Sequence, residues 1–191
     1  MKVLAINGSP RRKGNTYLSL NKVMEALESE GIATELAQMG GGHYHGCIAC
    51  YKCVDKKDRQ CHGPKDDMRE LIAKITEADG VLIGSPVYFG SVTAEVKALI
   101  DRAGLVAKAN DHLYSRKVGA AVVSVRRQGA LTTFNQINQF FLINMMIVPG
   151  SCYWNLAVGR DPGEVLNDEE GMRTMVTLGA NMAWLLKKLN V

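Results

Sequence analysis

The chain has 191 residues, of which 47% are hydrophobic and 22% charged, and its formal net charge is +4. This length suits one compact domain over 1–191 and disfavours a second domain. The basic runs at 11–13 and 126–127 are too short to indicate a nucleic acid partner, and we expect none. No apolar run has the length of a signal-peptide core or a membrane span, so we expect a cytoplasmic protein without membrane contact.

The first predicted element is a strand that leads through a glycine-containing loop into a helix. Its residues 3–6 form an almost continuous apolar run, which is typical of a parallel strand buried on both faces. A helix is predicted to begin near Asn15 or Thr16. Because a helix N-terminus presents free N–H groups and a positive dipole, the loop before it is suited to a phosphate. The candidate residues are Ser9, Arg11, Gly14, Asn15 and Thr16.

The spacing of this loop narrows the class of phosphate ligand. Gly8 and Gly14 are separated by five residues and followed by Asn15 and Thr16, which does not match the Walker A pattern. The dinucleotide fingerprint G-x-G-x-x-G is also missing, which favours a mononucleotide such as FMN. The alternative is an ordinary strand-to-helix turn.

A second strand is predicted at 34–38, and a segment without sustained periodicity follows over 40–66. This insertion contains four of the five cysteines, in the pattern Cys47-x2-Cys50-x2-Cys53-x7-Cys61. Four thiolates at this spacing are able to close around one 4Fe-4S cluster. The alternatives are tetrahedral zinc, with a histidine at 43, 45 or 62 as a substitute ligand, and a cysteine loop without metal. Cys152 is expected to be a buried apolar residue.

The rest of the chain alternates strands and helices. Asp67 to Glu70 has capping-box spacing, strands are predicted at 81–83, 118–125 and 146–148, and Asp168 is expected to cap the last helix. Such alternation predicts a doubly wound parallel sheet with helices on both faces.

Two loop sequences carry a family resemblance. G-S-P-R-x-x-G-N-T at 8–16 and G-S-P-V-Y-F-G at 84–90 resemble the flavodoxin-like NAD(P)H-dependent FMN reductase family. The resemblance implies a five-stranded sheet of order 2-1-3-4-5, which brings these two loops together at the switch point between strands 1 and 3. It also implies that the second loop holds the isoalloxazine ring, through Pro86, Val87, Tyr88, Phe89 and Gly90.

A third loop, after the fourth strand, borders the flavin in that family. Here it contributes Ser124, Arg126 and Gly129. The family commonly carries two adjacent glycines in this loop, whereas this chain has Gly129 alone, beside Arg126 and Arg127. The two arginines are candidates for binding NADPH phosphates or stabilising a reduced anionic flavin, and the alternative is that they are solvated.

The cysteine motif resembles the iron-sulfur flavoprotein branch of the same family. That resemblance implies an FMN-dependent oxidoreductase in which electrons pass between a ferredoxin-like carrier or NAD(P)H, a 4Fe-4S cluster and flavin, and then to a small-molecule or protein acceptor. Three alternatives remain open: a cluster-free FMN or quinone reductase, a flavodoxin-like electron carrier and a zinc-stabilised binding module. The resemblance and the apolar content of 140–148 and 153–154 also predict a homodimer or homotetramer.

Overall fold

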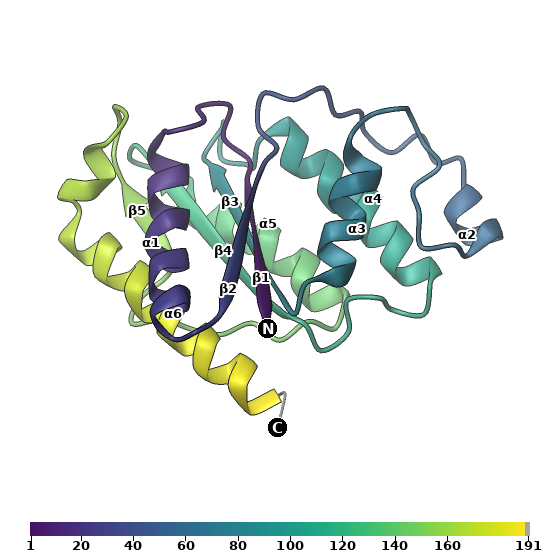
Figure 1. The fold of residues 1–191 in the computed structure, drawn as a ribbon. Helices are drawn as coiled ribbons and strands as arrows, with labels where there is room; N and C mark the ends of the chain where they lie inside the picture. Colours follow the sequence, from purple (N-terminus) through teal and green to yellow (C-terminus); the bar gives the residue numbers. More distant parts are fainter. Residues whose placement is uncertain (190–191) are drawn as a thin grey trace.

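In a computed structural model that describes residues 1–189, five parallel strands form one sheet (Figure 1). The order is β2-β1-β3-β4-β5, as predicted. The strands are β1 (Lys2–Asn7), β2 (Ala33–Gln38), β3 (Gly80–Pro86), β4 (Val118–Val125) and β5 (Leu156–Val158). Residues 190 and 191 of the predicted domain lie outside the described residues.

Helices cover both faces of the sheet, and each face has its own apolar core. The helices are α1 (Asn15–Ser29), α2 (Lys52–Lys56), α3 (Met68–Glu77), α4 (Ala94–Ala109), α5 (Ala130–Ile143) and α6 (Glu169–Leu189), with a 3-10 turn, η1 (Glu164–Asn167). Alternate residues of β1 enter the two cores: Val3 and Ala5 pack with α1 and α6, whereas Leu4 and Ile6 pack on the side of α3, α4 and α5. Burial on both faces explains why the central strands are apolar throughout.

Local groups fix several helix ends, and the cap predicted at Asp168 is confirmed. Gly31, with φ of +77°, follows the end of α1, and the hydroxyl of Thr93 accepts a hydrogen bond from the N–H of Val96 at the start of α4. Asp168 Oδ1 likewise accepts from the N–H of Gly171 at 3.0 Å. The predicted capping box at Asp67 is wrong, because Asp66 Oδ1 is the acceptor for the N–H of Met68 at 3.2 Å.

The predicted fifth strand at 146–148 is also wrong. Ile147 forms only an isolated bridge with Val118, and the chain then leaves the sheet at Pro149. The strand lies ten residues further on, where Leu156 pairs with Val123 near the carboxyl end of β4. Between the two pairings, the side chain of Asn155 donates to the backbone oxygen of Ala121 at 3.0 Å. The β-branched pair Ile147-Val148 therefore marks the first contact with the sheet edge and not the strand itself.

Within residues 1–189, none of the helices combines the length and apolar character required to cross a membrane.

Candidate functional site

A crevice of about 160 Å³ lies at the carboxyl ends of β1, β3 and β4. Its position matches the general rule that open α/β sheets bind ligands beyond the carboxyl ends of their strands, at the point where strand order reverses. Nine residues predicted from the sequence line it: Ser9, Arg11, Asn15, Thr16, Pro86, Val87, Tyr88, Ser124 and Arg126. Two lining residues, Gly159 and Arg160, were not predicted, because the loop that follows β5 was misplaced together with that strand.

A network of neutral side chains shapes the first loop. Asn7 Oδ1 accepts from the N–H of Ser9 at 3.1 Å, and Asn7 Nδ2 donates to Gln38 Oε1 at 2.7 Å. Gln38 Nε2 in turn donates to the backbone oxygens of Ser9 and Gly40, both at 2.8 Å. Gly40 packs so closely that a Cβ there would lie 2.2 Å from the carbonyl carbon of Ser9. The ends of β1 and β2 therefore fix the course of this loop together.

The first and second loops are joined directly. The N–H of Gly8 donates to the backbone oxygen of Gly84 at 2.8 Å, and Thr93 Oγ1 donates to the backbone oxygen of Gly8 at 2.9 Å. The N–H of Thr93 donates to Ser85 Oγ at 3.2 Å. Thr93 thus caps α4 and also connects two walls of the crevice.

The first loop offers donors of the kind that an anionic phosphate requires. Gly14 occupies the N-cap position of α1 and has no side chain, so it leaves the amides of the first turn available to a ligand. Ser9 and Thr16 are buried and line the crevice, and Arg11 is exposed at its rim. Asn15 differs, because its side chain donates to the backbone oxygen of Asp161 at 3.0 Å and accepts from the N–H of Gly163 at 2.8 Å. These donors fit a flavin phosphate, with Asn15 positioning the loop after β5.

The second and third loops meet at two glycines. Phe89 and Gly90 have φ of +50° and +75°, and they form a tight turn closed by the paired backbones of Tyr88 and Ser91. A Cβ on Gly129, whose φ is +88°, would lie 3.0 Å from the Cα of Gly90. Gly129 therefore permits both the left-handed backbone and the close approach.

Four predicted residues do not line the crevice with side chains. Gly14, Gly90 and Gly129 contribute backbone geometry, as described above. The ring of Phe89 is fully exposed to solvent, at 111% of its reference area. Arg127 is exposed as well and lies outside the lining, whereas Arg126 is part of it.

The four clustered cysteines line a second, separate cavity of about 20 Å³. It lies between the insertion and α4, at the end of the molecule where Figure 1 shows α2. Ala49 and Tyr51 have left-handed φ values of +51° and +53°, which curl the chain between Cys47 and Cys53. Non-glycine residues in the left-handed conformation are strained, and such strain concentrates at ligand-binding segments. Burial raises the pKa of the Cys53 thiol in the same segment.

The donor set fits an iron-sulfur cluster by its chemistry. All five cysteines are free thiols, and four of them face one cavity. Within residues 1–189, no three His, Cys, Asp or Glu side chains are grouped closely enough to hold a metal ion. The cavity volume is near that of one water, so a cluster would require the exposed part of the loop to move outward. Of the three histidines considered for zinc, only His62 lines the cavity, and its Nε2 lies 2.8 Å from Asp58 Oδ2.

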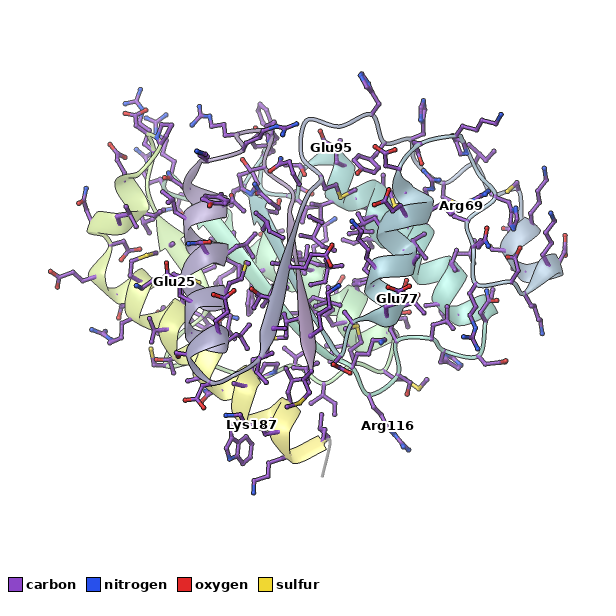
Figure 2. The ribbon with its side chains drawn as sticks, viewed as in Figure 1. Glu25, Arg69, Glu77, Glu95, Arg116 and Lys187 are labelled. Carbon is purple, nitrogen blue, oxygen red and sulfur yellow. The ribbon has the colours of Figure 1, made fainter. Side chains whose placement is uncertain are left out.

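Two buried polar residues that the sequence analysis missed anchor the insertion: Arg102 of α4 and Asn110, which directly follows this helix. Arg102 Nη1 donates to Asp66 Oδ2 at 2.6 Å, and Asn110 Oδ1 accepts from the N–H of Arg59 at 2.8 Å. Burial alone would raise the pKa of Asp66, but hydrogen bonds from Arg102 and two backbone amides hold it below its ordinary value. Arg69 of α3, labelled in Figure 2, adds a bond from Nε to the backbone oxygen of Cys61 at 3.4 Å. One sequence signal could have revealed Arg102: it lies three positions after Leu99, so a charged residue falls on the apolar face of the predicted helix.

Cys152 is exposed, and the prediction that it is buried is wrong. Its Sγ lies 3.5 Å from Thr174 Oγ1, a contact that lowers the pKa of the thiol.

A family model described as NADPH-dependent FMN reductase matches residues 1–161. The chain belongs to this family. It is 39% identical to an iron-sulfur flavoprotein of Methanocaldococcus jannaschii, over 98% of each chain. Among solved structures, RosB with a bound 8-demethyl-8-formylriboflavin-5'-phosphate intermediate superposes with a TM-score of 0.75 at 21% identity, covering 100% of this chain and 80% of RosB. A flavodoxin, WrbA-like protein from Agrobacterium tumefaciens gives a TM-score of 0.67 at 13% identity, over 98% of each chain.

These comparisons confirm three predictions. The protein is a member of the FMN reductase family, in its iron-sulfur flavoprotein branch, and it is an FMN-dependent oxidoreductase. Its fold is flavodoxin-like.

Proposed function

We propose that this FMN reductase family member is an oxidoreductase of the iron-sulfur flavoprotein type, with two redox centres on one chain. The flavin would supply hydride and electron chemistry in the crevice, and a 4Fe-4S cluster would supply single-electron transfer at the cysteine cavity. The observation that carries the proposal is the coexistence of these two sites: a crevice with phosphate donors and a cavity lined by four thiols.

In this proposal FMN binds with its phosphate on the first loop. The amides at the start of α1, the hydroxyls of Ser9 and Thr16, and the guanidinium of Arg11 would surround the phosphate oxygens. Pro86, Val87 and Tyr88 would border the isoalloxazine ring, with the glycines at 90 and 129 setting the course of the backbone and Ser124 closing the inner wall.

Arg126 and Arg160 make the rim of the crevice positive. Their side chains would favour a negatively charged donor or acceptor, or a reduced anionic flavin, through charge. NAD(P)H and an acidic ferredoxin-like carrier both satisfy that requirement, and the acceptor would be a small molecule or a protein.

The cluster ligands would be Cys47, Cys50, Cys53 and Cys61. Support comes from their common cavity and from the left-handed residues that turn the chain between them. The protein's part is to present four thiolates and to exclude water on the side packed against Leu105 and Val106 of α4.

Anaerobic purification with iron and sulfide analysis tests this function. We expect bound FMN and four irons per chain, and we expect Cys50→Ala to lose the broad visible absorption of the cluster while keeping a folded, yellow, FMN-loaded protein. Cys152→Ala is the matched control, because Cys152 lies outside the cavity. A wild type without iron, or undiminished electron transfer from a ferredoxin-like donor in Cys50→Ala, would leave a cluster-free NAD(P)H-dependent reductase. Zinc without flavin would instead support the binding module.

The proposal includes one domain over 1–191, a homodimer or homotetramer, and a reducing cytoplasmic location that keeps the thiols free. Leu142, Ile143 and Met145 of the predicted apolar segment are exposed, as are Tyr153 and Trp154, whereas Phe140 and Phe141 are buried. A second copy covering the exposed side chains would remove them from water. Sedimentation at micromolar concentration should show a dimer or larger species, and a monomer alone would contradict this part.

A further inference from the structure

Arg102 is a fully buried cation that contacts a cysteine sulfur. Its side chain is 1% exposed, and Nε donates to Cys61 Sγ at 3.2 Å. Nη1 donates to the backbone oxygen of His45 at 3.1 Å and to Asp66 Oδ2 at 2.6 Å, and Nη2 donates to the backbone oxygen of Pro64 at 3.3 Å. One guanidinium therefore connects both ends of the cysteine segment to the middle of α4.

The four cysteines differ in how firmly they are held. Cys47 is exposed, and it lies in a stretch without regular structure. Cys61 is partly buried and receives the Arg102 bond, and the turn that follows it is fixed by Asp66, which also accepts from the N–H of His45 at 3.0 Å. Because the cavity is too small for a cluster, binding one would require the outer part of the loop to move, whereas the Arg102 bond would keep Cys61 beside α4.

The orientation of the Arg102–Asp66 pair also has an electrostatic consequence. The pair is neutral in sum, but Nε–H faces the sulfur and the carboxylate lies on the other side of the guanidinium. A hydrogen bond and a nearby positive charge stabilise the more negative, reduced form of a cluster and so raise its reduction potential. At this position the effect would be strengthened by the burial of the guanidinium, because charges interact more strongly where water is excluded.

We infer that Arg102 is a positioning residue for the cysteine site: it holds Cys61 as the fixed ligand and raises the reduction potential of the cluster through its bond to the sulfur. The inference rests on the proposed function, because it assumes that Cys61 is a cluster ligand. It assigns a residue outside the cysteine motif, on a helix of the main fold, to the tuning of that site.

The test compares Arg102→Lys and Arg102→Met/Asp66→Asn with wild type. The double variant removes the cation and neutralises the carboxylate, so that no buried charge is left unpaired. Lysine keeps a positive charge but lacks the planar group that bonds four partners at once. Redox titration should show a lower cluster potential in both, with at least a tenfold change in the one-electron equilibrium constant, about 59 mV, in the double variant.

A second readout uses apoprotein, from which the iron has been removed. Hydrogen exchange at the backbone amides of 45–66 should be faster in both variants than in wild-type apoprotein, while amides of the crevice loops keep their rates. Lys108→Met is the matched control, since it removes an exposed cation from the same helix without touching the cysteine cavity. It should change neither the potential nor the exchange rates.

The outcomes separate this inference from the proposed function. Wild type without iron overturns the proposed function, and the role in tuning falls with it. A second outcome is that wild type holds a cluster and that Arg102→Lys and the double variant both keep the wild-type reduction potential. This outcome overturns the inference alone. A potential that falls equally in Lys108→Met also overturns it, because the effect would then follow net charge and not the bond to Cys61.

Discussion

The crevice and the cysteine loop are built in different ways. The crevice is shaped by strand ends, glycines and neutral side chains such as Asn7, Gln38 and Thr93, all connected to the central sheet. The cysteine loop has little regular structure. It is attached to α4 by the buried ion pair of Arg102 and to the C-terminal end of this helix by the buried amide of Asn110. The flavin site is therefore a property of the fold itself, whereas the cysteine site depends on a few side chains of an added segment.

The largest effect is expected on FMN affinity, when two proposed phosphate-binding side chains of the crevice are removed. Arg11→Ala combined with Thr16→Ala should weaken FMN binding by about 100-fold or more, since each substitution removes a hydrogen bond to the charged phosphate and such a bond contributes about 1.5–3 kcal/mol. Fluorescence titration of apoprotein with FMN measures the change. Arg12→Ala is the control, because Arg12 is exposed in the same loop and lies outside the lining. Unchanged affinity in the double variant would place the phosphate elsewhere.

Gly40→Ala should disturb the contact between the start of the cysteine insertion, at Gly40, and the crevice loop at Ser9. The new methyl group would meet the backbone of Ser9, and relieving such a clash costs about 1–3 kcal/mol of unfolding free energy. We expect weaker FMN binding together with a lower denaturation midpoint in urea. Gly46→Ala is the matched control within the insertion, where a Cβ has no neighbour within 4 Å, and it should be neutral. Equal effects of the two substitutions would contradict the close packing of Gly40 on Ser9.

Acid should separate the cysteine loop from the crevice loops that follow β1, β3 and β4, because neutral groups shape those three loops. The crevice loop after β5 is different, since the amides of Arg160 and Asp161 donate to the carboxylate of Glu164. The pKa of Asp66 is held below its ordinary value of about 3.9, chiefly by Arg102 acting against burial. The stabilisation is therefore complete above that value and is lost as the pH falls below 4 through the lowered pKa. Other titratable groups lie in the same segment: His45 Nδ1 is 3.4 Å from Asp66 Oδ2, and Asp58, whose pKa is also lowered, lies 2.8 Å from His62 Nε2.

Hydrogen-exchange protection of 45–66 in apoprotein should thus fall between neutral pH and pH 3, severalfold more than that of the crevice loops after β1, β3 and β4. Asp66→Asn should show low protection of this segment at both values. Loss of protection in both regions at the same pH would show instead that the loop unfolds only with the sheet.

The smallest effect is expected at Phe89. Its φ of +50° is unfavourable for an aromatic residue, and Asn-Gly is the preferred pair for this type of turn. Phe89→Asn should raise the unfolding free energy by about 1 kcal/mol or less. FMN affinity should stay the same, because the ring points into solvent. A marked loss of affinity would show that the Phe89 side chain turns toward the flavin.

The amino-acid sequence by itself determined the elements whose signals are local. The apolar runs of β1, β3 and β4 predicted buried parallel strands because both faces of these strands are covered. Four crevice residues followed from the strand-to-helix loop after β1, and five more in the loops after β3 and β4 followed from the family resemblance. A parallel sheet brings the carboxyl ends of these strands to one edge, which is why the three loops meet. The cysteine spacing was equally visible without a structure.

Only the tertiary structure decided the features that depend on distant pairing. β5 lies at Leu156–Val158 because Asn155 and β4 select that register, and Gly159 and Arg160 reach the crevice for the same reason. The partnership of Arg102 with Cys61 and Asp66 joins residues 41 and 36 positions apart, which no local pattern encodes. A buried charge is stable only with its partner in place, and that partner is chosen by how the insertion folds back onto α4.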